Sequence, residues 1–152
     1  MTGVPFWYGR RRMRIWPAWQ ALMAHRWPTS RQSRAPGCYQ AVPAVVAAFL
    51  DGSLVAAAWL HNVSGEPSVA NFGVTILPAF NRSGIAPVLL HELALEAVRR
   101  GVLTMKSCVG RGTRDHMKDC RSAGLPVLSA MGFGGVTEIV LGTSAMREAA
   151  LV

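Results

Sequence analysis

The feature that most constrains the fold of this chain is a segment in which a strand pattern passes through a short turn into a helix pattern. The apolar residues 74–77 end at Pro78. A polar turn follows, and Gly84 stands where a helix would begin. Apolar residues then recur at helical spacing as far as Val98, and Gly101 marks the expected end of the helix. The segment therefore predicts a strand joined directly to a long helix.

The turn has the layout of a phosphate-binding site. The first backbone N–H groups of a helix have no partner inside the helix, and the helix dipole favours an anion beside them. Gly84 would let a ligand approach the backbone closely, and Arg82 would add a fixed positive charge. Taken alone, however, these residues fit an ordinary strand-to-helix turn of an α/β protein better than a binding site.

The same segment resembles the acyl-CoA-binding motif of the GNAT N-acetyltransferase superfamily, in which a strand and Val-x-x-x-Pro precede Arg/Gln-x-x-Gly-x-Gly/Ala. In the last part of the motif, Gly84 and Ala86 match, whereas Asn81 stands where the family usually has Arg or Gln. Downstream, Gly132 and Phe133 resemble the Gly-Phe with which a helix of the family ends before the sixth strand. The resemblance covers residues 42–141.

The resemblance implies an α/β fold with a mixed, mostly antiparallel central sheet, flanking helices and a splay between two strands. The pantetheine arm of acetyl-CoA, the implied co-substrate, would insert into the splay and pair with the backbone of Ile76 and Leu77. The pyrophosphate would be held by the turn and the first helical residues, namely Asn81, Arg82, Ser83, Gly84, Ile85 and Ala86.

Three positions that commonly act in this family hold other residues in this chain. By spacing from Gly132, the tyrosine that protonates the departing thiolate falls at Leu128. A strand carboxylate falls near Asn71, and an asparagine after the fifth strand falls near Arg121. None of these side chains can take over the family's role unchanged, so the chemistry would need other groups.

Acetyl transfer to an amine needs that amine to be neutral, so a base or a water chain must remove its proton. His61, at the end of a hairpin strand, would titrate near neutral pH, and Glu66 lies in the turn before the motif strand. We take these two residues as candidate catalytic groups. The simpler interpretation is a surface histidine and a solvated turn charge.

The elements follow from hydrophobic periodicity and turn residues. We expect hairpin strands at 42–50 and 54–61 around Asp51-Gly52, a strand at 68–77, a helix at 84–100 and a strand at 102–109. A charged loop at 110–121, a short helix at 125–131 and a last strand at 136–141 would complete the domain. Before the hairpin we expect an arm or first strand at 1–15, a short helix at 17–26 and a polar loop at 28–37.

Charge is concentrated in the first third of the chain. Seven arginines and no acid precede Asp51, whereas nine basic and eight acidic residues follow residue 50. A group of arginines lies among aromatic residues, a composition that suits a polyanion or an anionic lipid surface. These are Arg10, Arg11, Arg12 and Arg14. A solvated basic arm is the simpler alternative.

Length and composition fit one GNAT-like domain over residues 1–152, in which residues 1–40 form a basic region with no recognised match. The apolar stretch 41–60 is interrupted by Asp51-Gly52, which predicts a hairpin and not a transmembrane segment. Cys38, Cys108 and Cys120 form no disulfide framework, which favours the cytoplasm. Cys108, His116 and Cys120 have no standard zinc-site spacing, so we expect no metal.

Three functions remain in view. The first is an N-acetyltransferase that moves an acetyl group from acetyl-CoA to a primary amine on a small molecule or a protein. The second is a CoA-binding protein of the same fold with little catalysis, which the three altered positions favour. The third is a nucleic-acid- or membrane-associated module that acts through its basic N-terminal arm. The acceptor and the oligomeric state have no signature in the sequence.

Overall fold

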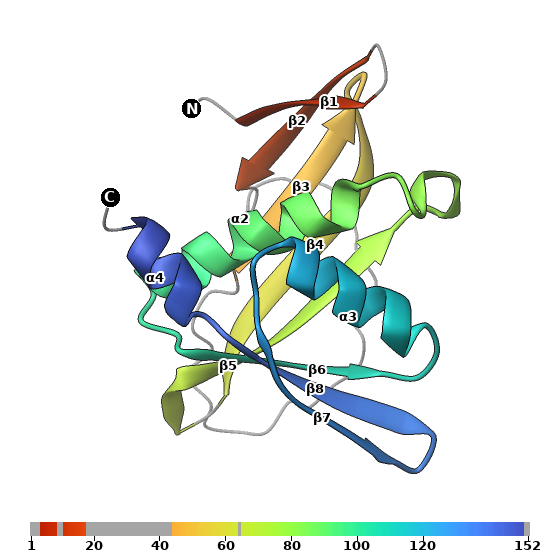
Figure 1. The fold of residues 1–152 in the computed structure, drawn as a ribbon. Coiled ribbons are helices and arrows are strands. Elements are labelled where there is room, and N and C mark those ends of the chain that lie inside the picture. Colours follow the sequence, from red (N-terminus) through yellow and green to blue (C-terminus); the bar gives the residue numbers. More distant parts are fainter. Residues whose placement is uncertain (1–3, 9–10, 18–43, 64, 151–152) are drawn as a thin grey trace, which may run out of the picture.

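The computed structural model describes residues 4–8, 11–17, 44–63 and 65–150 of the chain (Figure 1). These residues form one eight-stranded sheet with three α-helices and one short 3-10 helix. The strands are β1 (Val4–Tyr8), β2 (Arg11–Pro17), β3 (Ala44–Leu50), β4 (Ser53–Val63), β5 (Glu66–Ile76), β6 (Thr104–Val109), β7 (Val127–Phe133) and β8 (Val136–Gly142). The helices are η1 (Pro78–Phe80), α2 (Ile85–Arg99), α3 (Thr113–Ser122) and α4 (Ser144–Ala150).

The sheet is mixed and mostly antiparallel, which confirms the expected fold class. Its strand order is β1-β2-β3-β4-β5-β6-β8-β7, and only β5 and β6 run parallel. The chain crosses from β5 to β6 through α2, as a parallel pair requires. The hairpin between β3 and β4 turns at Asp51 and Gly52, whose φ angles of 50° and 81° fit a type I′ turn.

The three α-helices gather on one face of the sheet, and α2 lies across β3, β4 and β5 (Figure 1). Side chains alternate along β4, so that Ala56, Ala58 and Leu60 are buried on the helix side. The core between the layers is closed by fully buried apolar side chains. They include Leu89, Leu90 and Leu93 of α2, Met105 of β6, and Ile139 and Leu141 of β8.

Helix α2 ends where the sequence predicts it, in a Schellman motif. Gly101 has a φ of +76°, and its N–H donates to the carbonyl of Val98 at 3.0 Å. The next N–H, that of Val102, donates to the carbonyl of Ala97 at 2.9 Å. These two bonds satisfy carbonyls of the last turn, and the positive φ explains why glycine occupies this position.

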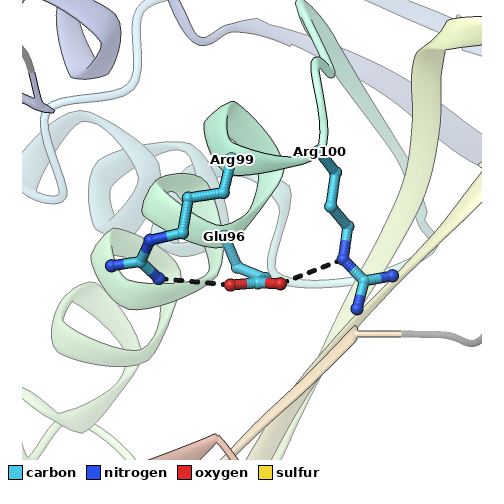
Figure 2. Close-up of polar contacts among 3 residues, drawn as sticks. All are labelled: Glu96, Arg99 and Arg100. Carbon is cyan, nitrogen blue, oxygen red and sulfur yellow. Dashed lines mark hydrogen bonds and ion pairs between the residues drawn. The ribbon is translucent and has the colours of Figure 1, made fainter.

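A small ion-pair cluster reinforces the same helix end. Glu96 pairs with Arg99 at 3.1 Å and with Arg100 at 3.0 Å (Figure 2). Both arginines lie at the end of α2, where the helix dipole favours a positive charge. The cluster therefore supports the C-terminus of α2 but leaves its N-terminus open.

The region after β6 contradicts the prediction of a charged loop, because residues 113–122 form the helix α3. Only Met117 and Cys120 provide apolar contact with the core from this helix, so the apolar period was too sparse to read. Asp115 in the first turn and Arg121 in the last turn complement the helix dipole.

The predicted short helix at 125–131 is also wrong, because this segment is strand β7. It pairs with β8 through a hairpin that turns at Gly134 and Gly135, which have φ angles of +58° and +77°. Two glycines between strand patterns are a hairpin signal. Gly132 and Phe133, interpreted as a helix end, therefore lie at the end of a strand.

At the other edge of the sheet, β1 and β2 form an antiparallel hairpin that pairs with β3. Part of the region 1–15 is thus strand, as one of the two alternatives had it. The helix predicted at 17–26 lies outside the described residues except for Pro17, the last residue of β2, and the polar loop at 28–37 lies outside them entirely.

Candidate functional site

The two parallel strands separate part-way along their length. Pairing between β5 and β6 is confined to Val69 with Thr104, Ala70 with Met105, and Asn71 with Lys106. Beyond this point β5 continues to Ile76 and β6 to Val109 without pairing to each other. The sequence predicts a splay between these two strands, and the register locates its closed end at Asn71 and Lys106.

The backbone of β5 directs alternate residues towards the splay. The N–H of Leu77 donates to the carbonyl of Val55 at 2.9 Å, so odd-numbered residues of this segment turn their backbone groups to β4. The carbonyl of Ser68 accepts from the N–H of Leu103 at 2.8 Å, on the β6 side. Even-numbered residues, among them Phe72, Val74 and Ile76, therefore present N–H and carbonyl groups to the splay.

This alternation separates the two predicted pantetheine contacts. Ile76 has its backbone open to the splay. The N–H of Leu77 is bonded to Val55, and its carbonyl accepts from the N–H of Phe80 at 2.8 Å. The prediction for Leu77 is therefore wrong, because strand register and not sequence proximity decides which residue faces the ligand.

The turn after β5 brings the predicted pyrophosphate-binding residues together at the N-terminus of α2. Residues Arg82 and Gly84 have positive φ angles of 59° and 81°, and Gly84 is the N-cap. Ser83 is turned inward, with its hydroxyl donating to the carbonyl of Phe80. The first turn of α2 contains no acidic side chain, and Gly84 provides no side-chain cap.

The open donors at this helix start are those of Gly84, Ile85 and Ala86. Within the described part of the chain, these N–H groups have no hydrogen-bond partner outside the helix, and the start of a helix provides none inside it. A Cβ at Gly84 would meet no atom within 4 Å. The arrangement leaves space and unpaired donors where an anion would bind.

A second helix N-terminus lies close to the first. The strand β6 leads through Gly112, with a φ of +73°, into α3. The guanidinium of Arg82 approaches the carboxylate of Asp115 in the first turn of α3 to 3.9 Å, and both side chains are largely exposed. The two diverging strands thus each lead into a helix, and the starts of the two helices meet at the open end of the splay.

The candidate base His61 lies near the closed end of the splay. It pairs with Asn71 across β4 and β5, and Asn71 pairs with Lys106 across β5 and β6. Their chain neighbours on the helix side are fully buried, so these three side chains project from the opposite face. His61 and Asn71 are exposed there.

Glu66 is far from this row. It is the first residue of β5, five residues before Asn71, which corresponds to roughly 16 Å of strand. It pairs with Val63 and is exposed at the end of the sheet away from the splay. The structure therefore does not bring together the two candidate bases, and it leaves only His61 near the thioester end.

The structure adds a residue that the sequence analysis considered only as a metal ligand. His116 of α3 stacks on Phe72, with ring centroids 5.8 Å apart and an angle of 18° between the rings. Its Nε2 atom is buried and has no hydrogen-bond partner. Burial also lowers the pKa of His116. Its spacing of four residues from the buried Cys120 was the available sign that both face the interior.

The predicted acid position must also be moved. Leu128 is 62% exposed on β7, so it does not lie on the helix that precedes the last two strands. That helix is α3, and Gly124 follows its end. The same four-residue spacing applied to Gly124 gives Cys120, and burial raises the pKa of its thiol to about 12. Arg121 lies in the last turn of α3, not directly after the fifth strand.

Two further kinds of site were tested. Among the described residues, no group of three or more His, Cys, Asp or Glu side chains could hold a metal ion. In the same part of the chain, no helix has both the length and the apolar character to cross a membrane.

Solved structures with this arrangement are acetyltransferases. The protein yncA of Salmonella typhimurium, assigned as an acetyltransferase and solved with acetyl-CoA, aligns with a TM-score of 0.56 and 20% identity over 67% of this chain and 65% of its own. The GNAT domain of S. lividans PAT aligns with a TM-score of 0.56 and 20% identity over 66% and 60%. This chain has the GNAT fold. An aminoglycoside acetyltransferase in complex with coenzyme A and kanamycin also aligns, with a TM-score of 0.55 and 13% identity over 70% of both chains.

The GNAT fold is what the likeness establishes, because sequence identity to these structures does not exceed 20%. The matched part spans 65% of the Salmonella chain and 60% of the S. lividans chain. No family model matches the sequence, and no curated protein matches it.

Proposed function

We propose that this chain binds acetyl-CoA and transfers the acetyl group to a primary amine. The observation that carries the proposal is the coincidence of two features, the splay between β5 and β6 and the unpaired N-terminus of α2 at its open end. Two similar structures hold acetyl-CoA or CoA, which supports the same ligand. In this proposal Asn81, Arg82, Ser83, Gly84, Ile85 and Ala86 surround the pyrophosphate.

The length of the splay agrees with the length of the cofactor arm. Pantetheine is about as long as four residues of extended chain, roughly 15 Å. From Ile76 back to Phe72, β5 covers four residues, roughly 13 Å. An arm that starts beside Ile76 and pairs with the open edge of β5 would thus carry its thioester to the level of Phe72 and Asn71.

The reaction would take place at that closed end. The amine nitrogen attacks the thioester carbonyl carbon, the C–S bond breaks, and the nitrogen loses a proton. We assign that proton to His61 or to water, since His61 lies on the helix-free face beside Asn71. Cys120 keeps its own proton, so the thiolate would take a proton from the departing ammonium or from solvent.

A second candidate is CoA binding with little catalysis. It is favoured by Asn71, which carries no carboxylate, and by the buried thiol of Cys120 in the position of the family's tyrosine. A cytoplasmic location, inferred from the cysteine content, belongs to the same proposal.

A CoA-release assay against a panel of amines and peptides, with thermal shift alongside, tests both candidates. Acetylation of an amine with release of CoA supports the transferase. A melting temperature raised by acetyl-CoA without turnover of any amine supports binding alone. No thermal shift at millimolar acetyl-CoA would contradict both.

The basic N-terminal region leads to a third candidate, binding of a polyanion. Arg11, Arg12 and Arg14 lie on β2, in the hairpin at the edge of the sheet, and Arg10 precedes them. Binding through these charges would weaken steeply with salt, because bound phosphates release counterions. Salt-independent binding of a labelled oligonucleotide, or no binding at low salt, would contradict this candidate.

A further inference from the structure

The buried Nε2 atom of His116 is a polar group for which the folded chain provides no partner. Its imidazole is stacked on Phe72, and no protein atom accepts from or donates to Nε2. A buried polar group without a hydrogen bond is rare and destabilising, and such groups gather where a ligand completes the bonding. His116 therefore needs an explanation that its packing does not give.

The position of Phe72 supplies one. Asn71 is the last residue of β5 that pairs with β6, so Phe72 is the first residue of the open segment. The side chain of Phe72 is buried on the helix side, where α3 brings His116 against it. His116 thus lies over the closed end of the splay, on the face opposite to His61.

The proposed function puts the reacting group at the same level. An extended pantetheine arm that begins beside Ile76 reaches Phe72, as the two lengths above require. The polar atoms near its end are the thioester sulfur and the thioester carbonyl oxygen, and of these the carbonyl oxygen is the strong hydrogen-bond acceptor.

We propose that Nε2 of His116 donates a hydrogen bond to the carbonyl oxygen of the bound acetyl thioester. This proposal rests on the proposed function, because it needs acetyl-CoA in the splay. It makes His116 a catalytic residue: the same donor faces the oxygen that becomes negative when the amine attacks.

The protonation state of His116 agrees with this role. Burial disfavours the charged imidazolium and lowers the pKa, so the ring is neutral at physiological pH. A neutral imidazole carries one N–H, and in the Nε2–H tautomer that donor points from the buried nitrogen. The ring would therefore act as a donor without having to lose or gain a proton.

The test compares two ligands that differ only in the acetyl group. Acetyl-CoA has the carbonyl, whereas CoA lacks it, and titration calorimetry gives both dissociation constants without any acceptor. His116→Phe keeps the ring that stacks on Phe72 and removes both nitrogens, while His116→Gln restores an N–H donor. His91→Phe is the control, since His91 lies on α2 and its Nδ1 is near the carbonyl of Ala123.

We expect His116→Phe to weaken acetyl-CoA about tenfold, the factor that one well-placed hydrogen bond provides, and to change the affinity for CoA less than twofold. His116→Gln should recover most of the loss, and His91→Phe should leave the ratio of the two affinities unchanged. In the parent protein labelled with 15N-histidine, the Nε2 signal of His116 should shift with acetyl-CoA and stay in place with CoA.

Equal weakening of both ligands in His116→Phe would show a packing role and overturn the proposal. An unchanged affinity for acetyl-CoA in that variant would also overturn it. If the variant fails to fold, an Nε2 signal of the parent that responds alike to both ligands has the same meaning. A parent protein that binds neither ligand would overturn the proposed function itself, and this inference with it.

Discussion

Replacement of Gly84 by glutamate separates backbone strain from ligand binding, because Gly101 at the other end of α2 provides a matched control. The two glycines have φ angles of +81° and +76°, and a Cβ at either would meet no atom within 4 Å. Left-handed backbone costs a non-glycine residue about 1–2 kcal/mol. Each variant should therefore lose about that much unfolding free energy, or about 2–8 °C of melting temperature for a chain of this size.

The helix dipole changes this comparison only slightly. A carboxylate is favourable at the N-terminus of a helix and unfavourable at its C-terminus, by about 0.3–1 kcal/mol. Gly101→Glu should accordingly be the less stable of the two variants, so a stability loss cannot explain a binding defect found only in Gly84→Glu.

Ligand binding should distinguish the variants sharply. At a concentration one hundred times Kd, a ligand specific for the folded state adds about 2.7 kcal/mol of stability, or roughly 5–11 °C. Gly101→Glu should keep this shift in a thermal melt with acetyl-CoA. Gly84→Glu should lose it, because its carboxylate would occupy the donors of the helix start and repel the pyrophosphate.

A full shift in folded Gly84→Glu would refute the assignment of the phosphate site to the start of α2. Loss of the shift in Gly101→Glu as well would refute the reasoning in another way, since strain alone would then account for the result. Circular dichroism establishes that both variants are folded before the melts are compared.

Three further predictions concern buried groups. Thr143 is fully buried and its hydroxyl donates to the carbonyl of Val102 at 2.8 Å, so Thr143→Val should lower the unfolding free energy in urea by about 1–3 kcal/mol, and a change below about 0.5 kcal/mol would contradict this. Because burial lowers the pKa of His116, the unfolded chain binds more protons, and stability should fall as pH drops below about 6.5. Melts between about pH 7 and pH 5 should fall less steeply in His116→Phe, and equal slopes would show that this histidine is not the cause. Iodoacetamide should label the exposed Cys108 of the folded protein and spare Cys120, whose pKa is about 12, so rapid labelling of Cys120 in a mass map would contradict its burial.

Local signals were sufficient where one residue type dictates one backbone conformation. Asp51-Gly52 predicted the hairpin, and Gly84 and Gly101 marked the two ends of α2. Gly134-Gly135 carried an equally strong hairpin signal, but the Gly-Phe before it was interpreted as a helix end. A motif match outweighed turn chemistry there, and the resulting error moved the acid position to Leu128.

Other features depend on strand pairing and cannot be read from one segment. Whether Ile76 or Leu77 faces the splay follows from the register of β5 with β4, which is set by residues some twenty positions away in the chain. The neighbourhood of His116 depends on how α3 lies over β5. The separation of β5 from β6 likewise arises because β6 pairs along its whole length with β8 but only briefly with β5.

The alternation along β5 also sets a rhythm in time. The amides of Gly73, Thr75 and Leu77 point to β4 and are protected, whereas those of Phe72, Val74 and Ile76 point to a neighbour that no described strand supplies. Exchange of these amides with deuterium should therefore alternate between slow and fast from one residue to the next. A pantetheine arm that pairs with the open edge would slow every second amide and leave its neighbours as they were, so the ligand would be recorded residue by residue along a single strand.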